Sequence, residues 1–270
     1  MTDIALTVFQ GRAGDRNDLA RPAALAIGAH YADALRISPA IVGTPRQAPE
    51  DGWLGELYAA MPELLTLASQ FETLLGLKKR PLTALGRCAA ALATLPAVAK
   101  AHPDAAILWF DAHGDLNTPE TSTSGYLGGM VLSGATGLWE SPLGNGLSMD
   151  NVILVGTRDL DPAEKEIIEA GKVARVAPGW GMGKALRAAI AGRPVYVHFD
   201  CDVLRPRTVP TELSSPGGMT LRDVKKAAEV IAEHDVLGLE IAELQMPEKG
   251  ELKLGPLTKA LEPIVTKMAA

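Results

Sequence analysis

Two acidic motifs each follow an apolar run, and their residue types could hold metal ions. The run AAILWF precedes Asp111, His113 and Asp115. The run PVYVHF precedes Asp200 and Asp202. Side chains two positions apart in extended backbone face the same way, so neighbouring strands would gather four carboxylates and an imidazole at one mouth. Unpaired buried charge of that size requires a cation, and oxygen-rich donors with one imidazole favour a carboxylate-bridged pair of Mn²⁺ or similar divalent ions.

Acidic residues also follow two other apolar runs. Asp161 and Glu164 come after VILV, and Glu240 and Glu243 lie at the end of DVLGLEIAE. An aspartate after a strand is often only a loop or helix cap, and D-P-A-E by itself is typical of a helix start with proline in the first turn. Acids at four strand ends nevertheless favour one shared binding site over four separate caps.

The composition indicates an ordinary globular protein with a small polar ligand. The chain has 270 residues, 47% of them hydrophobic and 21% charged, which suits one α/β domain with a sizeable core. A formal net charge of -6 argues against nucleic acid or an anionic membrane as a partner. Residues 1–30 carry scattered charges where an export signal needs an apolar core, so we expect a cytoplasmic protein with reduced cysteines.

Short β-branched runs alternate with longer segments of helical period, which is typical of βαβ units around a mostly parallel sheet. The strands are expected at residues 4–9, 40–42, 81–85, 106–110, 152–155, 173–176, 195–199 and 236–241. The helices are expected at residues 19–35, 53–75, 88–101, 125–138, 162–170, 182–191, 221–233 and 256–268. We therefore predict a single three-layer α/β/α domain over residues 1–270, with ligands bound beyond the carboxyl ends of the strands.

The motifs resemble those of the ureohydrolases, the family of arginase and agmatinase. D-A-H-G-D is similar to their D-A-H-x-D metal motif, D-C-D to their D-x-D motif, and G-L-E-I-A-E to their G-L-D-x-x-E segment. The resemblance runs from about residue 81 to the carboxyl terminus and implies an arginase-like fold with two Mn²⁺ per chain. It implies that Asp111 and Asp200 bridge the metals, that His113 and Asp202 complete one coordination shell, and that Asp115 contributes to the other.

The resemblance also implies a reaction and a substrate class. Two metals supply hydroxide at neutral pH, which would attack a guanidinium carbon. Glu243 would face the guanidinium, and Asp115 and Glu243 are the expected catalytic residues. The expected contacts to the α-carboxylate and α-amino group of an amino acid are Asn117, Ser122, Ser124, Asp161 and Glu164. The segment NTPETSTSG is also typical of an ordinary loop that ends in a serine helix cap.

Cys88 marks a departure from the family pattern. Most ureohydrolases carry G-G-D-H before the first motif, and here Cys88 falls at the place of the metal-binding histidine. A thiolate is a competent ligand for a transition metal, so Cys88 could replace the imidazole and shift the site towards softer ions. The alternative is a buried apolar cysteine with a weak or absent first metal. The pattern favours ligation, whereas Cys201, between Asp200 and Asp202, is expected to point into the core.

A second departure lies at Gly128, where arginases carry S-G-N-L-H and use the histidine as a proton shuttle. At both positions the sequence resembles one branch of the family. That branch acts on Nω-hydroxy-L-arginine in D-cycloserine biosynthesis and releases hydroxyurea and ornithine. A hydroxyguanidine is a weaker base than a guanidine and offers an extra oxygen near the metals. That substrate is our first expectation, ahead of arginine.

Two alternative functions remain open: another hydrolase activity of the family, and a role without catalysis. Agmatinase, guanidinobutyrase or formiminoglutamase activity would differ in the need for a free α-carboxylate, and loss of two histidines would also suit an inactive ligand-binding subunit.

His198 precedes Asp200 by two positions and is either a supporting partner of a ligating carboxylate or a core histidine. Because relatives are commonly trimers or hexamers, the resemblance implies a homo-oligomer.

Overall fold

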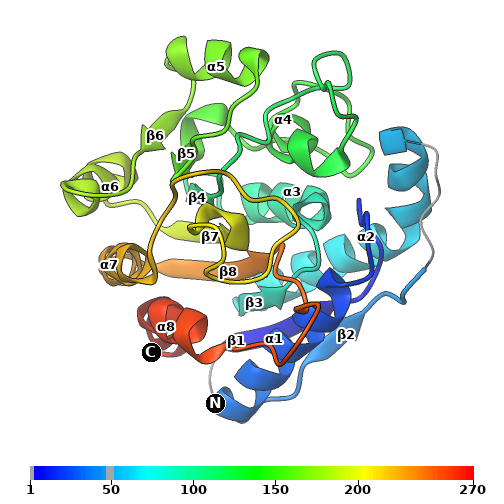
Figure 1. The fold of residues 1–270 in the computed structure, drawn as a ribbon, viewed down its shortest axis with the longest axis vertical. Helices are drawn as coiled ribbons and strands as arrows, with labels where there is room; N and C mark the ends of the chain where they lie inside the picture. Colours follow the sequence, from blue (N-terminus) through cyan, green and yellow to red (C-terminus); the bar gives the residue numbers. More distant parts are fainter. Residues whose placement is uncertain (1–2, 47–51) are drawn as a thin grey trace.

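One parallel β-sheet organises the chain. The computed structural model describes residues 3–46 and 52–270. Within these residues the sheet has eight strands, all parallel, in the order β2-β1-β3-β8-β7-β4-β5-β6 (Figure 1). The strands are β1 (Ile4–Phe9), β2 (Ala40–Val42), β3 (Arg80–Ala84), β4 (Ala106–Phe110), β5 (Val152–Val155), β6 (Ala174–Val176), β7 (Val195–Asp200) and β8 (Val236–Ala242).

Helices cover both faces of this sheet, so its strands are continuous apolar runs rather than alternating ones. The helices are α1 (Ala20–Leu35), α2 (Gly52–Gly76), α3 (Ala91–Ala101), α4 (Val131–Ala135), α5 (Pro162–Glu169), α6 (Met182–Ile190), α7 (Leu221–Ile231) and α8 (Gly255–Ala269). One buried cluster packs α1, α6, α7 and α8 against the sheet, and the other packs α2, α3 and α4 against the opposite face (Figure 1). The predicted three-layer α/β/α architecture is confirmed.

Most predicted elements lie within one or two residues of the observed ones, and the exceptions are the helices expected at 88–101 and 125–138. The first begins as a 3₁₀ helix, η1 (Cys88–Ala90), so its α-helical part, α3, starts only at Ala91. The second contains a short 3₁₀ helix, η2 (Leu127–Met130), followed by α4, which ends at Ala135. Gly125 has a φ of 60°, and Tyr126 is extended, so no helix can begin there. Two consecutive glycines then weaken the helical backbone, since glycine loses the most conformational freedom on folding.

Of the helices in the described parts of the chain, none combines the length and the apolar character that crossing a bilayer would require. Cys88 and Cys201 are both free and buried, as expected of reduced thiols. Cys201 belongs to the apolar cluster on the α1 side of the sheet, so its predicted core position is confirmed.

Candidate active site

The strand order brings the two acidic motifs together. β4 and β7 are neighbours, and Phe110 pairs with Phe199, so Asp111 and Asp200 lie at the same level of adjacent strands. The first residue of η1 (Cys88–Ala90), Cys88, follows β3, and Glu243 follows β8, on the other side of β7. Because parallel strands share one carboxyl edge, four central strands deliver their polar residues to one place. The expected proximity of the two motifs is therefore confirmed.

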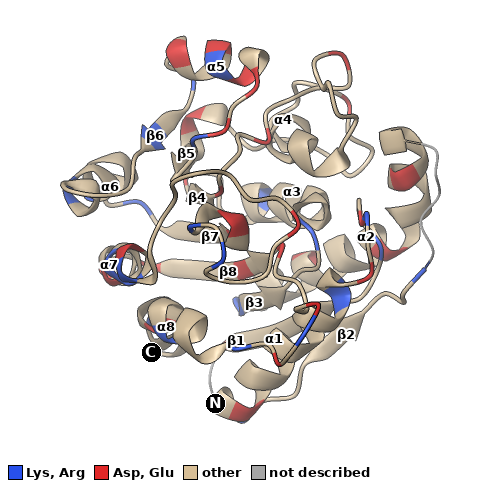
Figure 2. Cartoon of the chain, viewed as in Figure 1, with Lys and Arg blue, Asp and Glu red and all other residues tan. Residues whose placement is uncertain are grey.

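Three overlapping groups at this edge have ligand atoms within 4.8 Å of one another. These groups are Cys88 with Asp111 and Asp115; Asp111 with His113 and Asp202; and Cys88 with Asp200 and Glu243. Figure 2 shows acidic ribbon at the end of β7, where the aspartates of that motif lie. All the aspartates are buried, and His113 is partly exposed. The groups contain the six residues predicted as metal ligands together with Glu243, which the sequence analysis assigned to the substrate head group rather than to metal.

Backbone amides fix the carboxylates in place. Asp200 Oδ1 accepts the N–H of Asp202 at 2.7 Å, and Asp111 Oδ1 accepts the N–H of His113 at 2.6 Å. Asp202 Oδ1 accepts the N–H of Ala112 at 3.0 Å, which ties the two motifs to each other. Asp115 has a φ of 51°, a left-handed conformation that is strained for a residue other than glycine and typical of functional positions.

Burial makes this cluster unfavourable without a counter-charge. Burial and the charge of Asp111 raise the pKa of Asp115 well above its usual range, and burial and the charge of Asp202 do the same to Asp200. Burial acts in that sense on Asp111 too, but the hydrogen bonds and charge of His113 outweigh it and lower the pKa of Asp111. A divalent cation would relieve this repulsion and stabilise the ionised carboxylates.

The imidazole of His113 already points at carboxylate oxygens. Its Nδ1 lies 3.2 Å from Asp111 Oδ1 and 3.1 Å from Asp202 Oδ2. Burial would lower the pKa of His113, but the side-chain hydrogen bonds to these two aspartates raise it to about 12. A metal and a proton compete for the same nitrogen atom, so the arrangement fits a cation enclosed by Nδ1 and the two carboxylates. The residues present therefore fit a divalent metal centre.

Cys88 directs its sulfur into the acidic cluster. The thiol donates a hydrogen bond to Asp200 Oδ2 at 3.1 Å, and Sγ lies 3.1 Å from His198 Nε2. Burial, reinforced by the charge of Asp200, raises the pKa of the Cys88 thiol well above its usual range. A thiolate here would therefore need a bound cation to stabilise it.

His198 supports Cys88 from within the sheet. The ring is fully buried and stacks on Trp109, with 3.6 Å between ring centroids and 7° between planes. Its Nδ1 lies 2.7 Å from Glu240 Oε1. The sequence analysis expected His198 to be either a partner of a ligating carboxylate or a core histidine. The structure shows a buried histidine whose ring contacts the Cys88 sulfur instead.

Glu243 receives hydrogen bonds from three groups of the chain. Arg87 Nη1 donates to Oε2 at 2.7 Å, while the N–H of Cys88 at 2.8 Å and the hydroxyl of Tyr126 at 3.3 Å donate to Oε1. Glu243 also has a φ of 61°, the second left-handed acidic residue at the site. The carboxylate lines the cavity, as expected for a residue that meets the substrate head group, but it is already engaged with internal donors.

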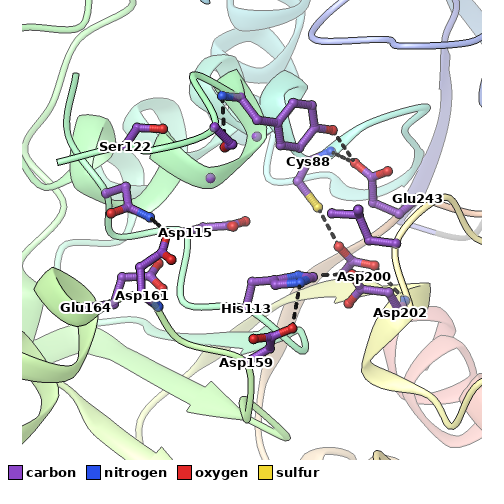
Figure 3. A pocket seen from close by; sticks show the side chains of 16 residues that line it. Cys88, His113, Asp115, Ser122, Asp159, Asp161, Glu164, Asp200, Asp202 and Glu243 are labelled. Carbon is purple, nitrogen blue, oxygen red and sulfur yellow. Dashed lines mark hydrogen bonds and ion pairs between the residues drawn. The ribbon is translucent and has the colours of Figure 1, made fainter. Parts of the chain in front are cut away.

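The cavity has a volume of about 220 Å³ and contains the predicted residues of both ends of a substrate. In Figure 3, Cys88, Asp200 and Glu243 lie on one side, and Ser122, Asp161 and Glu164 lie on the opposite side. The lining includes all the predicted substrate contacts, namely Asn117, Ser122, Ser124, Asp161 and Glu164. Asp111 is absent from the described lining, consistent with its position beneath the other acids.

The acids at the distal end of the cavity also have structural roles. Asp161 accepts a hydrogen bond from Asn117 Nδ2 at 2.8 Å. Glu164 accepts the N–H of Leu116 at 3.0 Å and the N–H of Asp161 at 2.9 Å, so it is the reciprocal arm of the capping box of α5. Asp161 and Glu164 therefore cap α5, as one interpretation of the sequence predicted, and they also line the cavity.

Sequence reasoning missed three residues of the site. Arg87 is buried directly behind the cavity, and Tyr126 and Asp159 line it. Arg87 had a detectable signal, since an arginine next to a ligand position after a buried strand requires acidic partners. Tyr126 had a weaker signal, since its ring occupies the space that a side chain at Gly128 would need: a Cβ there would lie 2.4 Å from the ring.

Comparison with known proteins gives these residues a family context. A protein-family model of the arginase family matches residues 50–251. The chain belongs to the arginase family. Membership makes the protein a ureohydrolase, which hydrolyses C–N bonds of amidino groups, as the motifs predicted.

Two arginase-family relatives illustrate the range of similarity. The chain is 38% identical over 250 residues to the N(omega)-hydroxy-L-arginine amidinohydrolase of Streptomyces lavendulae, covering 92% of this chain and 91% of that protein. It is 32% identical over 186 residues to the arginase of Glaciozyma antarctica, covering 60% of this chain and 53% of that arginase. The chain therefore spans nearly the whole of the first relative and about half of the second.

Solved structures of the arginase family share the fold. The arginase of Bacillus subtilis superposes with a TM-score of 0.79 at 23% identity, covering 98% of both chains. The proclavaminate amidino hydrolase of Streptomyces clavuligerus superposes with a TM-score of 0.71 at 21% identity, covering 99% of this chain and 90% of that one. At these identities the comparison establishes the arginase fold and leaves the substrate to the chemistry of the site.

Proposed function

We propose that this protein is a binuclear manganese amidinohydrolase that cleaves Nω-hydroxy-L-arginine to hydroxyurea and ornithine. The observation that supports it best is the composition of one cavity: metal donors at its base and a set of amide, hydroxyl and carboxyl groups at its distal end. Similarity to an N(omega)-hydroxy-L-arginine amidinohydrolase over nearly the full length of both chains adds support for the substrate.

In this proposal Cys88, Asp111, His113, Asp115, Asp200 and Asp202, whose ligand atoms fall in three close groups, would hold two Mn²⁺. Asp111 and Asp200 would be the shared ligands, as the family motifs imply. Oxygen donors dominate, which suits Mn²⁺, and Cys88 makes the site softer than an all-oxygen and imidazole site. When bound, the metals supply a nucleophile at neutral pH and neutralise the acids around them. Asp115 would also accept a hydrogen bond from the attacking water.

The chain's own groups hold the amino-acid part of the substrate. We assign the α-carboxylate to Asn117, Ser122 and Ser124, and the α-amino group to Asp161 and Glu164, all of which line the cavity. Glu164 is buried and tied to two backbone amides, so its position is fixed before the ligand arrives. Such preorganisation orients the amidino carbon towards the metal donors at a low entropic cost.

The test is a product assay on the manganese-loaded protein. We expect hydroxyurea from hydroxyarginine, less urea from arginine, and none from agmatine, which lacks the α-carboxylate. Metal analysis of the same preparation should give two equivalents per chain. Faster turnover of agmatine would support an agmatinase instead, and substrate binding without product in a protein free of metal would support an inactive ligand-binding subunit.

Asp200 provides a sharp test of the metal centre. Asp200→Ala removes a carboxylate that both metals would share, so we expect loss of bound manganese together with a fall in hydroxyurea release of at least about 10³-fold. Metal content by mass spectrometry and product formation are the two measurements. Asp150→Ala is the matched control because Asp150 is exposed and does not line the cavity. Normal metal content in Asp200→Ala would refute the shared-ligand role.

A further inference from the structure

Arg87 is an internal cation beside the cavity. Its side chain is only 1% exposed, and it directly precedes Cys88. Nη1 lies 2.7 Å from Glu243 Oε2, and Nη2 lies 2.5 Å from Glu212 Oε2. Nε lies 3.5 Å from Asp15 Oδ1. A buried arginine with three acidic partners stays charged, and its pKa is raised by the charge of Glu243 against the opposing effect of burial.

These contacts leave Glu243 little capacity for another guanidinium. Each carboxylate oxygen has about two lone pairs. Oε1 already accepts from the Cys88 N–H and the Tyr126 hydroxyl, and Oε2 accepts from Arg87. A bidentate guanidinium needs one free site on each oxygen, which this carboxylate does not offer. Arg87 therefore occupies the position on Glu243 that a cationic substrate would otherwise claim.

The charge of Arg87 disfavours a guanidinium at Glu243, as the hydrogen-bond geometry does. A cation placed next to Glu243 would be attracted by that carboxylate and repelled by Arg87, whose Nη1 lies 2.7 Å from Oε2, so the two electrostatic terms oppose each other. An uncharged head group loses nothing from this balance and can still use the remaining lone pair of Oε2. A hydroxyguanidine meets the requirement better than a guanidine, because it is the weaker base and is uncharged for more of the time near neutral pH.

We propose that Arg87 determines head-group selectivity: by holding Glu243 in an internal ion pair, it makes the cavity select an uncharged amidine over a guanidinium cation. Tyr126 completes the arrangement, since its hydroxyl fills Oε1 and its ring fits only because residue 128 is glycine. The assignment deepens the proposed function and rests on it for the identity of the substrate.

The test uses L-arginine and L-citrulline, its uncharged ureido analogue, as competitors of hydroxyarginine in the manganese-loaded wild-type protein. Hydroxyurea reports only on hydroxyarginine, so an inhibition constant follows for each competitor. We expect citrulline to inhibit at least as strongly as arginine. Inhibition by arginine more than about tenfold stronger than by citrulline would overturn the proposal, because a free carboxylate at Glu243 is worth about that factor for a cation.

Variants of Arg87 separate charge from packing. Arg87→Met removes the internal cation, and we expect the ratio of arginine to citrulline affinity to rise about tenfold. Arg87→Lys keeps the charge, so its ratio should stay near that of the wild type. An unchanged ratio in Arg87→Met, or an equal rise in both variants, would contradict the assignment.

Arg87→Met leaves Glu212 and Glu243 without their internal cation and Asp15 with Arg21 alone, so this variant could fail to fold. The double variant Arg87→Met/Glu212→Gln removes one of those acids, and Glu212→Gln alone is its control, expected to keep the wild-type ratio because Arg87 remains on Glu243. If the wild type releases no hydroxyurea, the proposed function fails. Calorimetric titration of arginine and citrulline still tests the charge selectivity in that case.

Discussion

The side chains of this site are held by hydrogen bonds to one another, and Cys88 is the clearest example. Cys88 has three neighbours within hydrogen-bonding or ligand distance: Asp200, His198 and, through its backbone N–H, Glu243. The cysteine thus contacts both Asp200 in the acidic cluster and Glu243 at the wall of the cavity.

We predict that Cys88→His retains two metals and raises activity on arginine relative to hydroxyarginine by about tenfold, because an imidazole restores the donor typical of arginases. The ratio of urea to hydroxyurea formation, with metal content, measures this. Cys201→Ala is the control, since this second buried cysteine lies in the apolar cluster. Should both variants lose metal equally, the ligand role of Cys88 would be wrong.

At the scale of elements, short turns after the strands shape the cavity. η2 replaces the first turns of the expected long helix and carries two glycines with different surroundings. A Cβ on Gly128 would lie 2.4 Å from the Tyr126 ring, whereas a Cβ on Gly129 would meet nothing within 4 Å. The two positions therefore form a matched pair within a single turn of the chain.

Gly128→Ala should destabilise the protein by about 1–3 kcal/mol through this overlap, and it should displace the Tyr126 hydroxyl from Glu243. Gly129→Ala should change the free energy of unfolding by less than about 0.5 kcal/mol. Denaturant titration measures both. Tyr126→Ala removes the ring that the new Cβ would meet, so Gly128→Ala should cost much less stability in the Tyr126→Ala background than in the wild type. An equal cost in both backgrounds would exclude a specific contact.

At the scale of the whole molecule, two apolar layers enclose a sheet whose carboxyl edge collects buried acids. The same edge contains buried carboxylates whose ionised form is unfavourable, since burial raises the pKa of Asp115, Asp200 and Asp202. A fold that concentrates acids in this way gains stability from a cation that binds only the native state.

Manganese should therefore raise the melting temperature of the protein. A free metal concentration of about 100 times Kd contributes about 2.7 kcal/mol, which corresponds to roughly 5–10 °C in Tm for a chain of this size. Thermal unfolding with a chelator, and then with manganese restored, measures the effect. The Asp200→Ala variant should show a much smaller shift, and an equal shift in that variant would place the stabilising ions elsewhere.

The sequence by itself determined the element types and the donor residues. Apolar β-branched runs alternating with helical segments specify a parallel sheet, and polar residues directly after those runs must lie at its carboxyl edge, because each strand carries its following residue to that edge. This local logic identified Asp111, His113, Asp200 and Asp202, whereas Cys88 was predicted only from the resemblance to the family motif. The same logic failed where consecutive glycines interrupted a helical period at residues 125–138.

Only the tertiary structure decided which strand ends meet and which side chains share a partner. The order β3-β8-β7-β4 depends on crossovers that no local pattern encodes, and it brings Arg87, which follows β3, against Glu243, which follows β8. That contact joins residues 156 positions apart in the chain, so its existence depends on packing across the sheet rather than on periodicity. The candidate metal donors could thus be predicted from the sequence, whereas the ion pair between Arg87 and Glu243 could be identified only from the fold.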